Sequence, residues 1–131
     1  MSVIEFPYSV YKGIKIPIIP VKIYLAKEEL EIAVFVDSGA TYTIIRAEEI
    51  KDMGFNFKKG KLKMIQVGDG SFIPVYLHNL RIEIGKKEIL ATIGFSERLG
   101  IEFNILGRKG VFKEFRVCFS DKKEKVTFYK E

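Results

Sequence analysis

The sequence is poor in the residues that build cross-links and cofactor sites. Its 131 residues include one cysteine, one histidine and no tryptophan. A single cysteine excludes an internal disulfide, and one cysteine with one histidine is too few for the usual structural zinc sites. We therefore expect neither a metal nor another cofactor. Cys118 is expected to be a small packed side chain in a strand, and His78 to be structural or exposed.

Long apolar runs are missing as well. The stretch from 14 to 21 is apolar but short, and Lys15, Pro17 and Pro20 interrupt it. A membrane-spanning helix needs about 20 consecutive apolar residues, and a secretory signal needs a continuous apolar core. The sequence thus predicts a soluble, cytoplasmic protein that does not bind a membrane.

The composition is that of a folded, β-rich protein. Apolar residues make up 47% and charged residues 30%, and eleven Phe and six Tyr favour strands over helices. The length predicts a single domain over residues 1–131. The net charge of +5 comes from lysines spread along the chain, so nucleic acid is not an expected partner. A small basic β-barrel that binds nucleic acid stays an alternative, which salt-dependent binding to single strands would support.

Alternating β-prone stretches and turn residues predict an all-β fold with two short helices. The helices are expected at 46–53, ended by Gly54, and at 109–115. Pro74 indicates that its strand is not central in a sheet. Strands are expected within 1–11, broken at Pro7, and at 21–25, 30–36, 42–45, 62–67, 72–76, 81–84, 88–93, 116–119 and 125–129.

One short run carries most of the functional information. The apolar residues Val34-Phe35-Val36 lead directly into Asp37, and Ser38-Gly39-Ala40 follow as a turn. A carboxylate at the end of a buried strand is costly unless it is hydrogen-bonded, paired or functional. Gly39 allows a backbone or a substrate to come close to that carboxylate. Asp37 is therefore the candidate reactive group.

The run Asp37-Ser38-Gly39-Ala40 resembles the active-site turn of aspartic proteases, and the chain length resembles the retroviral, or retropepsin, type. Two other motifs follow in the order of that family. Gly68-Asp69-Gly70, between β-prone arms of which the first ends at Val67, is similar to the tip of its flap hairpin. Ile105-Leu106-Gly107-Arg108 is similar to its signature of two apolar residues, Gly and Arg. The segment 44–55 resembles cellular, non-viral members.

The resemblance implies a closed barrel with a flap hairpin and two short helices, and it implies hydrolysis of peptide bonds without a metal. Aspartic proteases carry out such chemistry with two carboxylates that share one proton. The chain has only one Asp-Ser-Gly turn. Asp52, Asp69 and Asp121 do not end apolar strands. The second carboxylate is therefore expected to be Asp37 of another copy, in a symmetric homodimer that binds a polypeptide.

Roles for the other residues follow from the same resemblance. Asp37 is general base in one copy and general acid in the other. Ser38 holds the two turns in register, and Gly39 keeps the carboxylates open to substrate. Gly68 to Gly70 form the lid, and Gly107 permits close packing beside the turn. Candidates for lining the substrate site are Ala40, Val67 and Ile105.

The chain departs from viral members at two places. Thr41 stands where they commonly carry an acidic residue that pairs with the signature arginine, so Arg108 is expected to have another partner or none. Viral enzymes interleave both chain termini in an interface sheet. The segments 3–6 and 126–129 could do the same, or they could pack on their own subunit.

Other interpretations of these motifs stay open at the level of sequence. Asp-Ser-Gly could be an Asx-type turn, and Gly-Asp-Gly an ordinary hairpin turn. The fold could also serve as a catalytically inactive peptide-binding or dimerisation module that uses an open strand edge. The intact residues Asp37, Ser38 and Gly39 speak against this alternative.

Overall fold

The computed structural model describes residues 3–131. Over these residues the chain forms strands joined by turns, with two single-turn 3-10 helices. The elements are β1 (Val3–Pro7), β2 (Ser9–Tyr11), β3 (Ile14–Ile16), β4 (Ile18–Tyr24), β5 (Glu29–Val36), β6 (Thr43–Arg46), η1 (Ala47–Ile50), η2 (Phe57–Lys59), β7 (Lys61–Gln66), β8 (Phe72–Ile84), β9 (Lys87–Ser96), β10 (Asn104–Leu106), β11 (Phe115–Ser120) and β12 (Lys125–Lys130).

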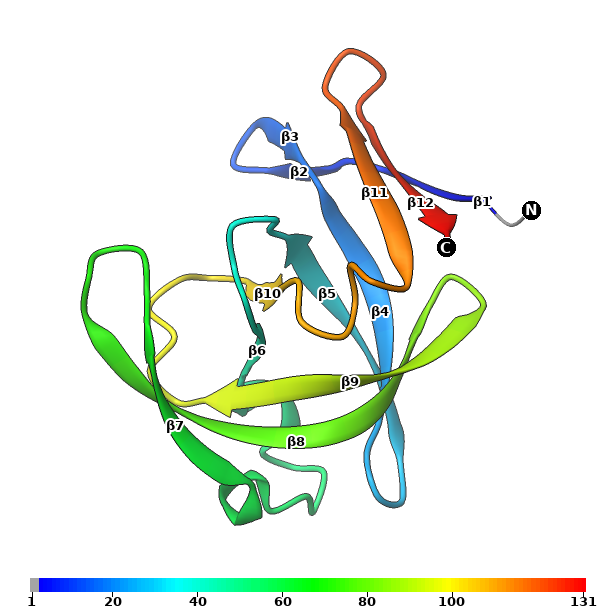
Figure 1. The fold of residues 1–131 in the computed structure, drawn as a ribbon. Coiled ribbons are helices and arrows are strands. Elements are labelled where there is room, and N and C mark those ends of the chain that lie inside the picture. Colours follow the sequence, from blue (N-terminus) through cyan, green and yellow to red (C-terminus); the bar gives the residue numbers. More distant parts are fainter. Residues whose placement is uncertain (1–2) are drawn as a thin grey trace.

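Seven strands form one sheet, and six of them close into a barrel-like ring, with β7 paired to β8 outside the closed path (Figure 1). Their order is β4-β5-β10-β6-β9-β8-β7, and β4 also pairs with β8, which brings the sheet back on itself. The pairing between β4 and β8 is short, with Lys22 opposite Glu83 and Ile23 opposite Ile82. A strand places successive side chains on opposite faces, so the ring can direct one face inward. The predicted all-β fold is confirmed.

The interior of the ring is filled by aliphatic and aromatic side chains. In β5 the buried residues are Ile32, Val34 and Val36, which alternate with more exposed ones. This two-residue period is what a half-buried strand requires. Val34, Phe95 and Leu106 are completely buried in the main core. The strand that leads into Asp37 therefore contributes its buried face to this core.

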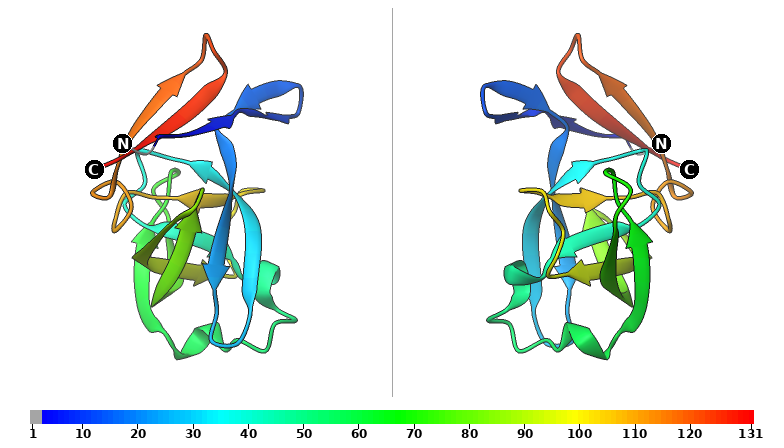
Figure 2. Two further views of the ribbon diagram at one scale, coloured as in Figure 1. Left: turned by 90° about the vertical axis from the view of Figure 1, so that its right-hand side faces the viewer. Right: turned by 90° about the vertical axis from the view of Figure 1, so that its left-hand side faces the viewer.

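A second sheet of three strands, in the order β1-β12-β11, lies beside the ring (Figure 2). In this sheet β1 and β12 run antiparallel, from Val3 opposite Tyr129 to Pro7 opposite Lys125. Phe128 packs edge-on against Phe6 and Phe115. The strands β1 and β12 thus pair within their own subunit, which is one of the two arrangements left open by the sequence.

Several local predictions need correction. Residues 109–114 form a series of turns rather than a helix, and Phe115 already begins β11; Gly110 has φ +80°, which a right-handed helix cannot accommodate. The helix expected at 46–53 shrinks to η1, and η2 was not predicted. Cys118 is exposed on β11, at the edge of its sheet, rather than packed.

Two strand predictions also change. The strands expected at 72–76 and 81–84 are one continuous strand, β8, which lies between β7 and β9. Pro74 is nevertheless paired only on the β7 side, opposite Met64, because the pairing with β9 starts at Tyr76. At Pro74 the strand is therefore locally an edge, as proline requires. The small β2–β3 hairpin was not predicted.

Candidate active site

The turn that follows β5 holds Asp37 in a fixed position. The Asp37 N–H donates to the Leu106 carbonyl at 3.0 Å, and the Ala40 N–H donates to the Asp37 carbonyl at 3.1 Å. The Gly39 N–H donates to Asp37 Oδ1 at 2.9 Å. Asp37 is half-buried, and both Ser38 and Gly39 are exposed. The carboxylate is therefore anchored by its own turn and remains reachable from solvent.

The strand β10 fixes this turn from the other side. It pairs parallel with β5 and antiparallel with β6, so it lies between the strand before the turn and the strand after it. Beyond β10, the Arg108 N–H donates to the Ala40 carbonyl at 2.9 Å and the Lys109 N–H to the Thr41 carbonyl at 2.8 Å. The two segments predicted as active-site turn and signature are thus joined by main-chain hydrogen bonds.

Gly107 is required by the closeness of this contact. A Cβ atom at Gly107 would lie 2.3 Å from the carbonyl oxygen of Tyr42 and 2.4 Å from its carbonyl carbon. These are backbone atoms, which cannot swing away as a flexible side chain could. The Gly107 N–H also donates to Thr43 Oγ1 at 3.0 Å, in a fully buried hydrogen bond. Only glycine therefore fits beside the turn.

Two buried polar residues support the site and were missed by the sequence analysis. Thr43 is the acceptor for Gly107, and Asn104 joins three segments. The Asn104 side chain accepts from the Arg46 N–H at 2.8 Å, and its amide nitrogen donates to the Ala33 carbonyl at 3.0 Å and to a Glu49 carboxylate oxygen at 2.8 Å. A polar residue inside an apolar strand was the available signal.

The signature arginine has no acidic partner on this turn. Thr41 is exposed, and Arg108 is exposed and forms no ion pair within residues 3–131. Lys109 instead lies near Tyr42, with Nζ 5.2 Å from the ring centroid. The departure at Thr41 therefore removes a side-chain ion pair, and the main-chain bonds at Ala40 and Thr41 hold the segments together.

The second predicted element is the β7–β8 hairpin, whose arms pair from Lys61 opposite Leu77 to Gln66 opposite Phe72. At the tip, the Gly70 N–H donates to the Val67 carbonyl at 2.9 Å, and Gly70 has φ +88°. The Ser71 hydroxyl and N–H both donate to Asp69 Oδ1. These bonds, the hydroxyl first, lower the pKa of Asp69 below its ordinary value.

A small apolar cluster joins this hairpin to the strand after the turn. Ile44 of β6 is buried together with Ile73 and Val75 of β8, and Tyr42 and Val67 pack against them. Ile105 lies opposite Ile44 in the sheet. The structure therefore brings Val67 and Tyr42 to one cluster. Gly68, Asp69 and Gly70 are exposed at the tip, and within residues 3–131 no hydrogen bond joins them to the Asp37 turn.

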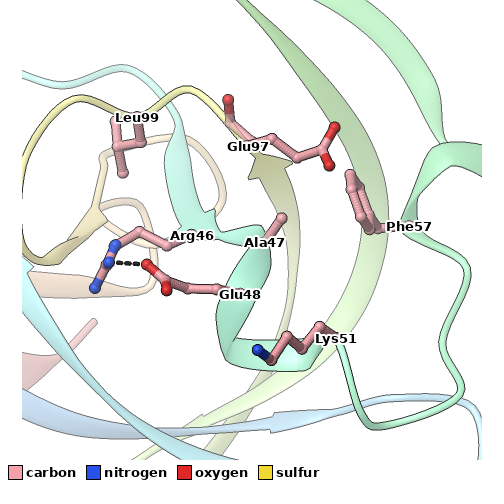
Figure 3. Close-up of a pocket in the computed structure, with 8 residues that line it drawn as sticks. Arg46, Ala47, Glu48, Lys51, Phe57, Glu97 and Leu99 are labelled. Atoms are coloured by element: carbon pink, nitrogen blue, oxygen red, sulfur yellow. Dashed lines mark ion pairs between the residues drawn. The ribbon is translucent and has the colours of Figure 1, made fainter.

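A separate cavity of about 410 Å³ lies near η1 (Figure 3). It is lined by residues of both charges, among them Arg46, which is paired with Glu48, and Glu97. None of the predicted site residues lines it. Over residues 3–131 there is also no group of three or more His, Cys, Asp and Glu side chains that could hold a metal ion. The same residues contain no helix long and apolar enough to cross a membrane.

Solved structures share this arrangement. A retropepsin-like aspartic protease from Rickettsia conorii is similar with a TM-score of 0.62 and 17% identity, over 98% of this chain and 93% of its own. EIAV protease, in complex with the inhibitor HBY-793, is similar with a TM-score of 0.54 and 19% identity, over 76% of this chain and 88% of its own. The chain has the fold of the retropepsin-like aspartic proteases, as predicted.

Comparison at the level of sequence gives no further assignment. No family model matches the chain, and no curated protein matches it.

Proposed function

We propose that residues 1–131 form an aspartic endopeptidase that acts as a symmetric homodimer. The observation that carries this proposal is the position of Asp37: an accessible carboxylate on a turn locked by β5, β10 and β6, in a retropepsin-like fold. No other Asp of the chain lies in an Asp-Ser-Gly run. A second copy of the same turn is therefore the proposed source of the second carboxylate.

In the proposed dimer, peptide hydrolysis proceeds without a covalent intermediate. One Asp37 carboxylate accepts a proton from a water molecule, whose oxygen attacks the carbonyl carbon of the scissile bond. Asp37 of the second copy donates its proton to the carbonyl oxygen. The resulting diol collapses as the C–N bond breaks: the first Asp37 gives its newly acquired proton to the leaving amine, and the second Asp37 takes a proton from a hydroxyl of the diol, which becomes the carboxyl product. The two carboxyl groups then again share one proton.

The residues around Asp37 take supporting roles in this proposal. The exposed Ser38 hydroxyl follows the carboxylate in the chain and is available to bond across the two-fold axis. Gly39 leaves the outer side of Asp37 without a side chain; a Cβ there would lie 3.3 Å from Asp37 Oδ1. The β7–β8 hairpin serves as the flap, with Val67 to Gly70 as the part that covers a bound polypeptide and excludes water.

The test is cleavage of an unfolded protein between about pH 4 and 6, with the oligomeric state measured for each sample. Wild type should cleave as a dimer, with a bell-shaped pH dependence. Asp37→Asn should have the same size and no activity, and a statine-type transition-state analogue should block the wild type. Activity proportional to protein concentration far below the dimer dissociation constant would contradict the shared site.

One observation favours the alternative of an inactive binding module. The strands β1 and β12, whose counterparts viral enzymes interleave between subunits, are already paired with each other in this chain. The edges of that sheet are β1 and β11, and either could accept an extended peptide by strand addition. A stable monomer that binds peptides equally well as wild type and as Asp37→Asn, and cleaves none, would establish this alternative.

A further inference from the structure

A second cavity, of about 310 Å³, lies beside the Asp37 turn at the base of the β7–β8 hairpin. Three lysines, Lys61, Lys63 and Lys109, contribute to its lining, together with Tyr42, Asn79 and Thr92. Among residues 3–131, no acidic side chain lines it. Its chemistry is therefore different from that of the cavity near η1, whose lining carries both charges.

The strand register explains why these groups converge. Lys61 lies opposite Leu77 and Lys63 opposite Val75, and directly opposed residues share one face of a sheet. Val75 is buried in the apolar cluster under the hairpin, so the two lysines, which are exposed, lie on the same face of the hairpin as that cluster, here called the inner face. Asn79 lies opposite Thr92 on the neighbouring strands. The inner face is thus apolar toward the tip of the hairpin and basic toward its base.

The charges of the three lysines are not compensated. None of them forms an ion pair within residues 3–131, although seven ion pairs occur elsewhere in that range. Lys109 is fixed next to the turn by its N–H bond to Thr41 and by its position over the Tyr42 ring. Like charges that converge on one hollow repel one another, and a bound anion relieves that repulsion. The site is therefore suited to an anionic group.

We propose that this pocket binds the carboxylate of a glutamate or aspartate side chain in a polypeptide that lies between the hairpin and the turn. The inference rests on the proposed function and adds a preference to it. Tyr42 packs against the apolar cluster that includes Val67 and also lines the basic pocket. An extended peptide, at about 3.3 Å per residue, can place apolar side chains on the cluster and an acidic one in the pocket.

The experiment measures peptide binding to Asp37→Asn by fluorescence anisotropy, so that nothing is cleaved. An apolar peptide is compared with versions that carry Glu or Gln at each position in turn. At one position Glu should bind about fivefold more tightly than Gln at low salt, and the difference should shrink at high salt. Equal binding of Glu and Gln at every position would overturn the proposal.

Matched charge variants make the result specific. Lys61→Gln, Lys63→Gln and Lys109→Gln together should abolish the preference for Glu. Lys27→Gln, Lys122→Gln and Lys123→Gln remove the same charge from exposed sites that do not line the pocket, and the preference should remain. If both triple variants lose the preference for Glu over Gln equally, the preference is a general effect of net charge, and the proposal that the pocket binds the carboxylate is overturned. A phosphoserine peptide that binds while the Glu peptides do not would overturn the carboxylate assignment in favour of phosphate.

The experiment distinguishes failure of the proposed protease function from failure of the pocket proposal. Wild type should cleave the uncharged Gln peptides, and cleavage does not depend on the pocket. If no peptide is cleaved or bound, amide chemical shifts of wild type are followed during titration with glutarate and with inorganic phosphate. Shifts at Lys63, Thr92 and Lys109 with glutarate would support the carboxylate site, and no shifts there would overturn it.

Discussion

The turn that carries Asp37 and the tip of the β7–β8 hairpin are held in opposite ways. The turn donates a main-chain hydrogen bond to Leu106 of β10 and accepts two from residues 108 and 109, and Tyr42 next to it packs against Gly107 without space for a methyl group. The tip is held by its own turn bonds and by the Asp69–Ser71 contacts, and a Cβ at Gly68 would meet nothing within 4 Å. The same sheet therefore carries one segment that many contacts hold in place, the Asp37 turn, and one that few contacts hold, the tip of the hairpin.

This contrast fits the division of labour in the proposed enzyme. A carboxylate that shares a proton with a second copy must be placed accurately, and rigid neighbours provide that placement. A flap must open to admit a polypeptide, so few buried contacts are an advantage there. The small apolar cluster of Ile44, Ile73 and Val75 lies between the rigid turn and the lightly held tip.

The largest expected effect comes from adding a methyl group on the rigid side. Gly107→Ala should lower the free energy of unfolding by about 3 kcal/mol, because the new Cβ meets the Tyr42 backbone. Gly68→Ala is the matched control on the other side and should change it by less than about 0.5 kcal/mol. Urea denaturation measures both. Equal losses of unfolding free energy in the two variants would show that the turn and the tip are not held differently.

The next effect concerns the buried hydrogen bond behind the turn. Thr43→Val keeps the shape but removes the acceptor for the Gly107 N–H, and an unpaired buried donor costs about 2 kcal/mol. Thr43→Ser retains the hydroxyl and should keep most of the stability, again measured by urea denaturation. The proposed activity should fall in the valine variant and recover in the serine variant. A stable, active Thr43→Val protein would show that the turn does not need this bond.

A smaller effect is expected at the tip itself. Gly70 has φ +88°, so Gly70→Ala should cost about 1 kcal/mol through backbone strain, although the side chain has space. The loss should be local, because the tip contributes little to the core. Amide exchange should speed up over 67–71 and stay unchanged in β5 and β10. Faster exchange throughout the ring would show that the tip and the core unfold together.

The smallest effect is a pH dependence of the tip. Since the Ser71 hydroxyl and N–H hold the pKa of Asp69 below its ordinary value, these bonds persist above that lowered pKa and are lost as the pH falls through it. The Ser71 amide resonance should titrate accordingly, and in Ser71→Ala the pKa of Asp69 should rise toward its ordinary value. A Ser71 amide that does not respond down to the acid limit of folding would contradict the coupling.

The structural elements predicted correctly from sequence are those with a local signal. The turn at Asp37 could be found because an apolar strand and a Ser-Gly-Ala run are adjacent in the chain, and the arms of the β7–β8 hairpin flank a Gly-Asp-Gly segment. The structure agrees with these elements because strand alternation and turn chemistry depend on neighbours.

What could not be predicted depends on distant parts of the chain. The closure of the ring through Ile23 and Ile82 and the junction made by Asn104 and Arg46 join segments that are far apart in the sequence. The segment 109–115 was expected to be a helix, but Gly110 adopts a positive φ there, next to residues that are bonded to the Asp37 turn. No short pattern records such constraints, because they arise only when the segments meet.

The pairing of β1 with β12 separates folding from assembly. Because these two strands pair with each other within one chain, a subunit of the proposed dimer would be folded before it meets its partner. Below the dissociation constant of the proposed dimer, the concentration of active species then rises with the square of the subunit concentration. The cellular concentration of the subunit would then control the proposed activity, which would stay low until that concentration approaches the dissociation constant.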